Sequence, residues 1–202
     1  MFSLLYGFWR YLFQKDEYYV LILGLDNAGK TTFLEQTKIS MNPGYKGLNL
    51  MKISCTVGLN IGKIDSDGVV LNFWDLGGQS ELQCLWDKYY AESHAIIYVV
   101  DSSDHERLDE SKQAFDKMME NESLKGTPLL FVANKQDVSK CLPITRIMDQ
   151  FRLETIISAA QRDFHFVAVS ALKGDGIKES IDWIIETVKK NNVFKPPING
   201  TE

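Results

Sequence analysis

The chain has 202 residues, of which 45% are hydrophobic and 24% charged, and these values are typical of one compact globular domain. Such a composition excludes a disordered or fibrous protein. The net charge of −5 lacks the basic excess of a nucleic-acid-binding protein, so we expect no nucleic-acid partner.

An apolar segment opens the chain. Nine of the twelve residues in 2–13 are apolar or aromatic, and the run is shorter than the ~20 residues that span a bilayer. We interpret residues 1–16 as an N-terminal amphipathic helix that lies on a membrane surface. The alternative is a helix packed permanently on the domain, and the pattern alone does not separate the two.

A glycine-rich turn follows the first predicted strand, Tyr18–Leu23. Residues 24–31 read GLDNAGKT and match the phosphate-binding pattern G-x-x-x-x-G-K-[ST], and a helix is predicted directly after it over Lys30–Thr37. Glycines let successive backbone N–H groups face phosphates, and the helix N-terminus adds its positive end. Lys30 supplies a positive charge to the β- and γ-phosphates, and the Thr31 hydroxyl binds Mg²⁺. The nucleotide-binding residues predicted here are Asp26, Asn27, Ala28, Gly29, Lys30, Thr31 and Thr32.

The alternative for this motif is a glycine-rich turn whose threonine caps the helix. The flanking strand and helix argue against that alternative, because the phosphate-binding loop requires both of them.

A β-hairpin comes next. Asp67-Gly68 lies between two apolar runs, Leu59–Ile64 and Val69–Phe73, and this pattern predicts one antiparallel strand beside the others. Further strands are predicted at Ala95–Val100, Leu129–Ala133 and Phe166–Val169. They alternate with helices predicted at Glu106–Glu120, Ile144–Ala160 and Lys178–Lys190. The alternation predicts an α/β fold with a mostly parallel six-stranded sheet, one antiparallel strand and helices on both faces.

Four residues around the hairpin indicate a magnesium and hydrolysis site. Asp75 stands at a predicted strand end, where it can hold Mg²⁺, we expect through a water. Gly78 can offer its N–H to a γ-phosphate, and Gln79 is placed to orient an attacking water as the catalytic residue. Thr56, upstream of the hairpin, could bind Mg²⁺ and complete its shell when a γ-phosphate is present. The alternative for Thr56 is an ordinary residue at a strand start.

A second motif, residues 134–137 (NKQD), follows the predicted buried strand at 129–133. The carboxylate of Asp137 can accept both N–H groups on the Watson–Crick edge of guanine, and a buried donor left unpaired costs about 1–3 kcal/mol. Lys135 can lay its stem along the base, and Asn134 can tie loops together. After the last predicted strand, a backbone N–H within Ser170, Ala171 and Leu172 could meet guanine O6. These loops all follow strand ends, where open α/β sheets bind their ligands.

Together these residues resemble the small GTPases. Residues 24–32 (GLDNAGKTT), 74–79 (WDLGGQ) and 85–90 (LWDKYY) are similar to the Arf branch, and Asp26 stands where many other small GTPases have glycine. The resemblance covers about residues 17–190. It implies the small-GTPase fold, with a GTPase domain at 17–192 and a C-terminal tail at 193–202 after Pro196-Pro197.

The resemblance also implies a function and partners. It implies a monomeric GTP/GDP switch, Mg²⁺-dependent and slow without a partner, which acts on the cytoplasmic face of Golgi and trans-Golgi membranes and cycles with the cytosol. Its partners would be an exchange factor, a GTPase-activating protein and trafficking effectors. Phe2 replaces the glycine that is myristoylated in many Arf proteins, so a Golgi integral-membrane receptor would replace the lipid.

Two further departures from ordinary Arf sequences concern the region before the hairpin. Residues 39–53 look longer than in Arf, and Pro43, Gly44 and Gly47 suit a flexible insertion in the first switch. Leu59 stands where Arf proteins usually carry phenylalanine.

Two alternative functions belong to other classes. The first is a nucleotide-dependent binding module with negligible hydrolysis, and Gln79 argues against it. The second is a metabolic phosphotransferase that uses ATP, and the guanine-reading motif at residues 134–137 argues against it.

Overall fold

The computed structural model describes residues 15–159, 162–193 and 195–198, so the predicted N-terminal helix lies almost entirely outside the described residues. Its centre is a six-stranded sheet in the order β2-β3-β1-β4-β5-β6. All neighbours are parallel except β2 and β3, which confirms the predicted fold class. The strands are β1 (Asp16–Leu23), β2 (Leu59–Ser66), β3 (Val69–Leu76), β4 (Ala95–Asp101), β5 (Leu129–Asn134) and β6 (Phe164–Ala168).

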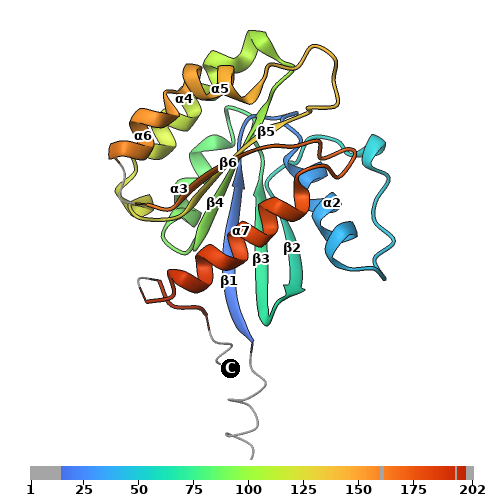
Figure 1. The fold of residues 1–202 in the computed structure, drawn as a ribbon, viewed down its shortest axis with the longest axis vertical. Coiled ribbons are helices and arrows are strands. Elements are labelled where there is room, and N and C mark those ends of the chain that lie inside the picture. The colour runs from blue at the N-terminus through green and yellow to red at the C-terminus, as the bar shows by residue number, and fades with distance from the viewer. Residues whose placement is uncertain (1–14, 160–161, 194, 199–202) are drawn as a thin grey trace, which may run out of the picture.

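Helices cover both faces of the sheet. In Figure 1, α2 (Lys30–Met41) and α7 (Ile177–Lys190) lie in front of the sheet. Successive residues of a strand point to opposite faces, so β1 contributes side chains to two hydrophobic cores. Val20 and Ile22 pack with α2 and α7 in the first core, whereas Leu21 and Leu23 belong to the second core, on the other face. The second core is covered by α3 (Asp87–Tyr90), α4 (Leu108–Met119), α5 (Ile144–Phe151) and α6 (Leu153–Ala159).

The hairpin forms as predicted. Ser66 pairs with Val69, so the loop holds only Asp67 and Gly68, whose φ angles are 51° and 77°. Positive φ at both loop residues is the geometry that matches the twist of the flanking strands.

The helix predicted at 144–160 is wrong in one respect, because it is two helices. Arg152 adopts a left-handed backbone with φ of 53° and separates α5 from α6. Phe151 and Leu153 are both fully buried. In one continuous helix these two side chains would point about 160° apart, so the break lets both reach the core.

Four short 3₁₀ helices complete the fold: η1 (Leu50–Lys52), η2 (Gln83–Leu85), η3 (His105–Arg107) and η4 (Glu122–Leu124). Past α7, the chain returns to the sheet, where the Ile198 N–H donates to the Glu17 carbonyl at 2.9 Å. The domain boundaries at residues 16 and 192 stay predictions. Among the described residues, no helix combines the length and apolar character that crossing a membrane requires.

Candidate nucleotide-binding site

The glycine-rich loop between β1 and α2 is shaped by close contacts that exclude side chains. Gly24 has a φ of 135°, and a Cβ there would lie 2.1 Å from the Val99 carbonyl oxygen. Gly29 has a φ of 93° and precedes α2 directly, and a Cβ there would meet the Asn134 amide at 2.3 Å. Glycine is therefore required at both positions, and the loop curls as phosphate binding demands.

Lys30 lies inside this loop and is only 5% exposed. Its ammonium donates to the backbone carbonyls of Gly24 at 2.9 Å and Leu25 at 2.7 Å. Burial lowers the pKa of Lys30 to about 8, against the opposing effect of the nearby Asp75 and Asp26 carboxylates. A buried ammonium held by neutral carbonyls gains strongly from an anionic partner, which a phosphate supplies.

Three side chains from separate segments meet at the end of β3. The Thr31 and Thr56 hydroxyl oxygens lie 2.6 Å apart, and Thr31 donates to Asp75 Oδ2 at 2.7 Å. The Asn60 amide donates to the same oxygen at 3.2 Å, whereas the buried Asp75 Oδ1 has no partner within the described chain. Burial raises the pKa of Asp75, although hydrogen bonds from Thr31 and Asn60 lower it.

This arrangement fits a hard divalent cation such as Mg²⁺. The donors are two hydroxyls beside a buried carboxylate with one free oxygen, and oxygen donors in small number are what Mg²⁺ takes when phosphates supply the rest. Among the described residues, no group of three or more His, Cys, Asp or Glu side chains is placed to hold a metal ion.

The segment after β3 lies against the glycine-rich loop. A Cβ on Gly78 would come within 2.3 Å of the Asp26 nitrogen, so only glycine permits this approach. The indole of Trp86 donates to the Gly77 carbonyl at 3.0 Å and helps to hold the segment. Gly78 lines a cavity beside the glycine-rich loop, whereas the half-buried Gln79 is not among the lining residues of that cavity.

The β5 end ties the base side of the site together. The Asn134 side chain is buried, and its Nδ2 donates to the Ala28 carbonyl at 2.8 Å. Its Oδ1 accepts from the Ala171 N–H at 3.0 Å. One amide side chain thereby links the phosphate loop to the loop after β6.

Two further side chains of this motif have partners. Lys135 has a φ of 64°, and its ammonium lies 2.6 Å from Asp101 Oδ2. Asp137 Oδ1 accepts from the Ser170 hydroxyl at 2.6 Å. Leu172, the last residue predicted here, is 42% exposed. The structure thus gathers the predicted base-reading residues at one end of the sheet.

Several neighbours of the site were not predicted. Arg107 donates to Asp26 Oδ1 at 2.8 Å, and this hydrogen bond holds the pKa of Asp26 below its usual value. The Cys55 thiol donates to Asn27 Oδ1 at 3.2 Å. No sequence signal points to Arg107 or Cys55, because both contacts depend on how loops fold. Asn60 could have been found, since a two-residue hairpin loop sets it opposite Asp75.

The segment between α2 and β2, residues 42–58, is held against α2 near its N-terminal end. Glu35 of α2 is only 2% exposed, and its carboxylate accepts from the Tyr45 hydroxyl at 2.8 Å and from the Lys38 ammonium at 2.6 Å. Burial raises the pKa of Glu35, but these two hydrogen bonds, the Lys38 charge and the Leu48 N–H together outweigh it, and the net pKa is lowered. The predicted insertion is therefore attached to α2 near Tyr45.

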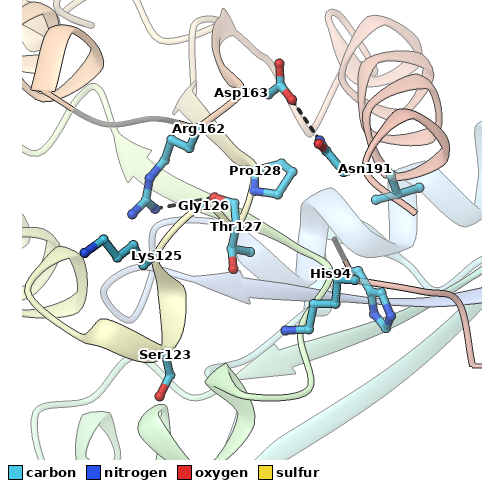
Figure 2. Close-up of a pocket in the computed structure, with 11 residues that line it drawn as sticks. His94, Ser123, Lys125, Gly126, Thr127, Pro128, Arg162, Asp163 and Asn191 are labelled. Carbon is cyan, nitrogen blue, oxygen red and sulfur yellow. Dashed lines mark hydrogen bonds between the residues drawn. The ribbon is translucent and has the colours of Figure 1, made fainter. Parts of the chain in front are cut away.

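A cavity of about 240 Å³ lies at the carboxyl ends of the strands. Its lining includes Thr56, Gly78 and Lys135 and, from the glycine-rich loop and the start of α2, Asp26, Asn27, Gly29, Lys30, Thr31 and Thr32. A larger cavity of about 700 Å³ (Figure 2) is lined by residues that precede β4, β5 and β6, at the other end of these strands, and by none of the residues named above. Size alone would select the wrong cavity, since the phosphate loop and the Thr31 and Thr56 hydroxyls belong to the smaller one. A phosphate loop and a base-reading motif on this sheet define a P-loop nucleotide-binding protein of the small-GTPase class.

Comparisons with known proteins identify the family within this class. The model of the ADP-ribosylation factor family matches residues 5–188, and the chain belongs to this family of small GTPases. It is 57% identical over 197 residues to ADP-ribosylation factor-related protein 1 of Bos taurus, a match that covers 98% of this chain and 97% of the relative. Identity to the Homo sapiens protein of the same name is 56%, with the same coverage.

More distant relatives agree. ADP-ribosylation factor-like protein 3 of Saccharomyces cerevisiae is 42% identical over 200 residues, which are 98% of this chain and 99% of the relative. A solved structure of the Arl6 BBS3 small GTPase from Trypanosoma brucei, with the bound nucleotide analogue GppNp, matches with a TM-score of 0.75 and 32% identity. That match covers 86% of this chain and 98% of the solved chain. The resemblance seen in the sequence is thus confirmed.

Proposed function

We propose that this chain is a molecular switch that binds GTP or GDP with Mg²⁺ and recruits effectors in its GTP-bound state. The observation that carries the proposal is the meeting of Thr31, Thr56 and Asp75. Thr31 belongs to the phosphate loop, whereas Thr56 belongs to the segment before β2. A ligand that binds both hydroxyls therefore couples the nucleotide to the conformation of that segment, which is the physical basis of a switch.

Each part of the site has a role in binding. The backbone of residues 26–32 and the Lys30 ammonium bind phosphates, Asp137 holds the guanine, and Asn134 ties the surrounding loops together. Thr31 and Thr56, with Asp75 behind them, would hold Mg²⁺. When bound, this cation neutralises charge on the β- and γ-phosphates.

Gln79 is the proposed catalytic residue, because it follows Gly78 at the γ-phosphate side and its amide can orient water. Its side chain does not line the cavity, so we propose that a partner protein places it and that hydrolysis alone is slow. In the alternative, a binding module with negligible hydrolysis, Gln79 has no role. Gln79→Leu separates the two: it abolishes partner-stimulated hydrolysis in the first case and changes nothing in the second.

The effector surface is proposed on the segment that contains Thr56. Met51 is 79% exposed, Val57 81% and Ile61 60%, and exposed apolar side chains of this kind mark protein interaction sites. Because Val57 adjoins Thr56, a change at the γ-phosphate alters the surface that an effector meets. The family membership supports such partners.

We further propose that the switch acts on the cytoplasmic face of Golgi and trans-Golgi membranes, with residues 1–16 as the membrane-binding segment. The support is the apolar composition of residues 2–13 and the similarity to ADP-ribosylation factor-related protein 1. An integral-membrane receptor, an exchange factor and a GTPase-activating protein are the partners that this role requires.

Competition binding tests the nucleotide specificity. Fluorescent GDP bound to the full chain is displaced by GTP, GDP or ATP, with Mg²⁺ or with EDTA. We expect GTP and GDP to compete at far lower concentration than ATP, and EDTA to weaken both. Equal competition by ATP would favour the metabolic phosphotransferase instead.

Vesicle sedimentation tests the membrane role separately. The chain is loaded with GDP or a GTP analogue and compared with a variant that lacks residues 2–14. We expect only the full chain with the GTP analogue to sediment with vesicles. If the sedimented fraction is the same with either nucleotide and with or without residues 2–14, the proposed role of the N-terminal segment is contradicted.

A further inference from the structure

The larger cavity, of about 700 Å³, lies at the amino ends of the parallel strands, whereas the phosphate loop lies at their carboxyl ends. Its walls come from the residues before β4, β5 and β6 and from the end of α7 (Figure 2). The volume of about 700 Å³ falls in the range of small-molecule sites. Gly126 in its wall has a φ of 76°, and a Cβ there would meet no atom within 4 Å, so the space beside it is open.

The charges that line this cavity are mostly positive. Lys125, Arg162 and Lys195 contribute cations, and Asp163 is the acidic residue of the lining. The Asp163 carboxylate already accepts from the Lys190 ammonium and the Asn191 amide, each at 2.8 Å. Within the described lining, the three cations therefore lack a matching set of anions.

Arg162 has only long hydrogen bonds to described residues. Its hydrogen bonds to described residues both come from Nη1, to the Thr127 carbonyl at 3.4 Å and the Met119 sulfur at 3.8 Å. Its Nε is buried and has no partner within the described chain. Burial lowers the pKa of Arg162, with no carboxylate acting against it. A half-buried guanidinium without a carboxylate is stabilised by an anionic ligand that forms charge-assisted hydrogen bonds.

The other polar groups suit a phosphate. Figure 2 shows the Arg162 and Lys125 side chains pointing to the same side, with the Thr127 and Ser123 hydroxyls in the same wall. Lys125 is 83% exposed, and its contact with Glu122 is long at 3.8 Å, so its ammonium is available. His94 adds no charge, because burial lowers its pKa and its Nδ1 accepts from the Tyr19 N–H.

We propose that this cavity binds a phosphate ester of a small polar molecule, with Arg162 and Lys125 as its main ligands. The cavity exceeds a bare phosphate, so an organic group such as a polyol fills the remainder. The source is either a soluble metabolite or a lipid headgroup. The position of the cavity suits a headgroup, because β1, which follows the proposed membrane-binding segment, begins at the same end of the sheet. That last step rests on the proposed membrane role, whereas the anion site does not.

The test uses the full chain loaded with GDP and Mg²⁺, so that the phosphate loop is occupied. Amide NMR spectra are recorded during titration with inorganic phosphate and then with a soluble inositol bisphosphate. We expect saturable shifts at Gly126 and Thr127, with Gly29 unchanged. Arg162→Gln and Lys125→Gln should each weaken binding about tenfold, the effect of one charge-assisted hydrogen bond, whereas the control Lys178→Gln on α7 should not.

Sedimentation with phosphatidylcholine vesicles, with and without phosphatidylinositol phosphate, separates the two sources. Binding that requires the phosphorylated lipid and both cations assigns a headgroup, and binding of the soluble ester alone assigns a metabolite. The exposed Lys125 serves as a second variant that leaves folding intact. The proposal is overturned if neither phosphate compound shifts Gly126 and Thr127, or if both variants bind as tightly as the unmodified chain.

Discussion

Asn134 offers the sharpest quantitative prediction, because one buried side chain satisfies two buried backbone groups. Its Nδ2 pairs with the Ala28 carbonyl and its Oδ1 with the Ala171 N–H. Ala28 is 2% exposed and Ala171 is 1% exposed, so water does not reach either group in the folded protein. Asn134→Ala leaves both unpaired, which destabilises the GDP-bound protein by about 2–6 kcal/mol at about 1–3 kcal/mol for each group.

Asn134→Asp separates hydrogen bonding from side-chain volume. The aspartate keeps the shape and the acceptor for the Ala171 N–H, but it places an oxygen against the Ala28 carbonyl. Two acceptors facing each other repel, and a buried charge adds its own desolvation penalty. We therefore expect Asn134→Asp to be at least as destabilising as Asn134→Ala, although it leaves no void.

Two assays check this reasoning. Urea unfolding of the GDP-bound protein measures the loss in the free energy of unfolding. The release rate of fluorescent GDP measures the weaker hold on the nucleotide, and it should rise about tenfold for each 1.4 kcal/mol by which GDP binding is weakened. The matched control is Asn192→Ala, at an exposed position just after α7. If Asn134→Asp unfolds and releases GDP like the unmodified protein, the bridging role is wrong.

Three other predictions follow from the same site. Lys30 has a pKa of about 8 without nucleotide and must carry a proton to bind phosphate, so GDP affinity should fall by up to about tenfold per pH unit above that value. Calorimetry in two buffers at about pH 9 should then detect nearly one proton taken up, and a flat pH profile contradicts this. Asp137→Asn should weaken GTP binding and admit xanthine nucleotides in the competition assay, and unchanged GTP affinity would remove Asp137 from base recognition. Tyr45→Phe removes a hydrogen bond to Glu35, so the free energy of unfolding should fall by about 1 kcal/mol and amide exchange at residues 44–53 should accelerate. Unaltered exchange would show that this hydrogen bond does not hold the segment against α2.

Local patterns in the sequence were sufficient to predict the sheet, the hairpin loop and the phosphate loop. The buried strands read as continuous apolar runs because both faces are covered, and the Asp67-Gly68 turn fixed the hairpin register. The phosphate loop was predictable because glycine is the residue that its positive φ angles and close contacts require.

Features that depend on tertiary contacts were not predictable. The break at Arg152 carries no glycine or proline, and it exists because two nearby side chains must both reach the core. The Arg107 contact with Asp26 joins residues 81 positions apart, and no local pattern records such a pair. The cationic cavity around Arg162 likewise gathers residues from four separate segments.

Hydrogen exchange of the full chain, loaded with Mg²⁺ and either GDP or a GTP analogue, tests the central claim most directly. Thr56 and Gly78 belong to the two segments that approach the phosphate loop. If the γ-phosphate orders these segments, residues 54–58 and 77–80 will exchange more slowly with the GTP analogue, while β5 stays the same in both states. Identical exchange in both segments would show that the nucleotide does not set their conformation, and the chain would not be the switch proposed here.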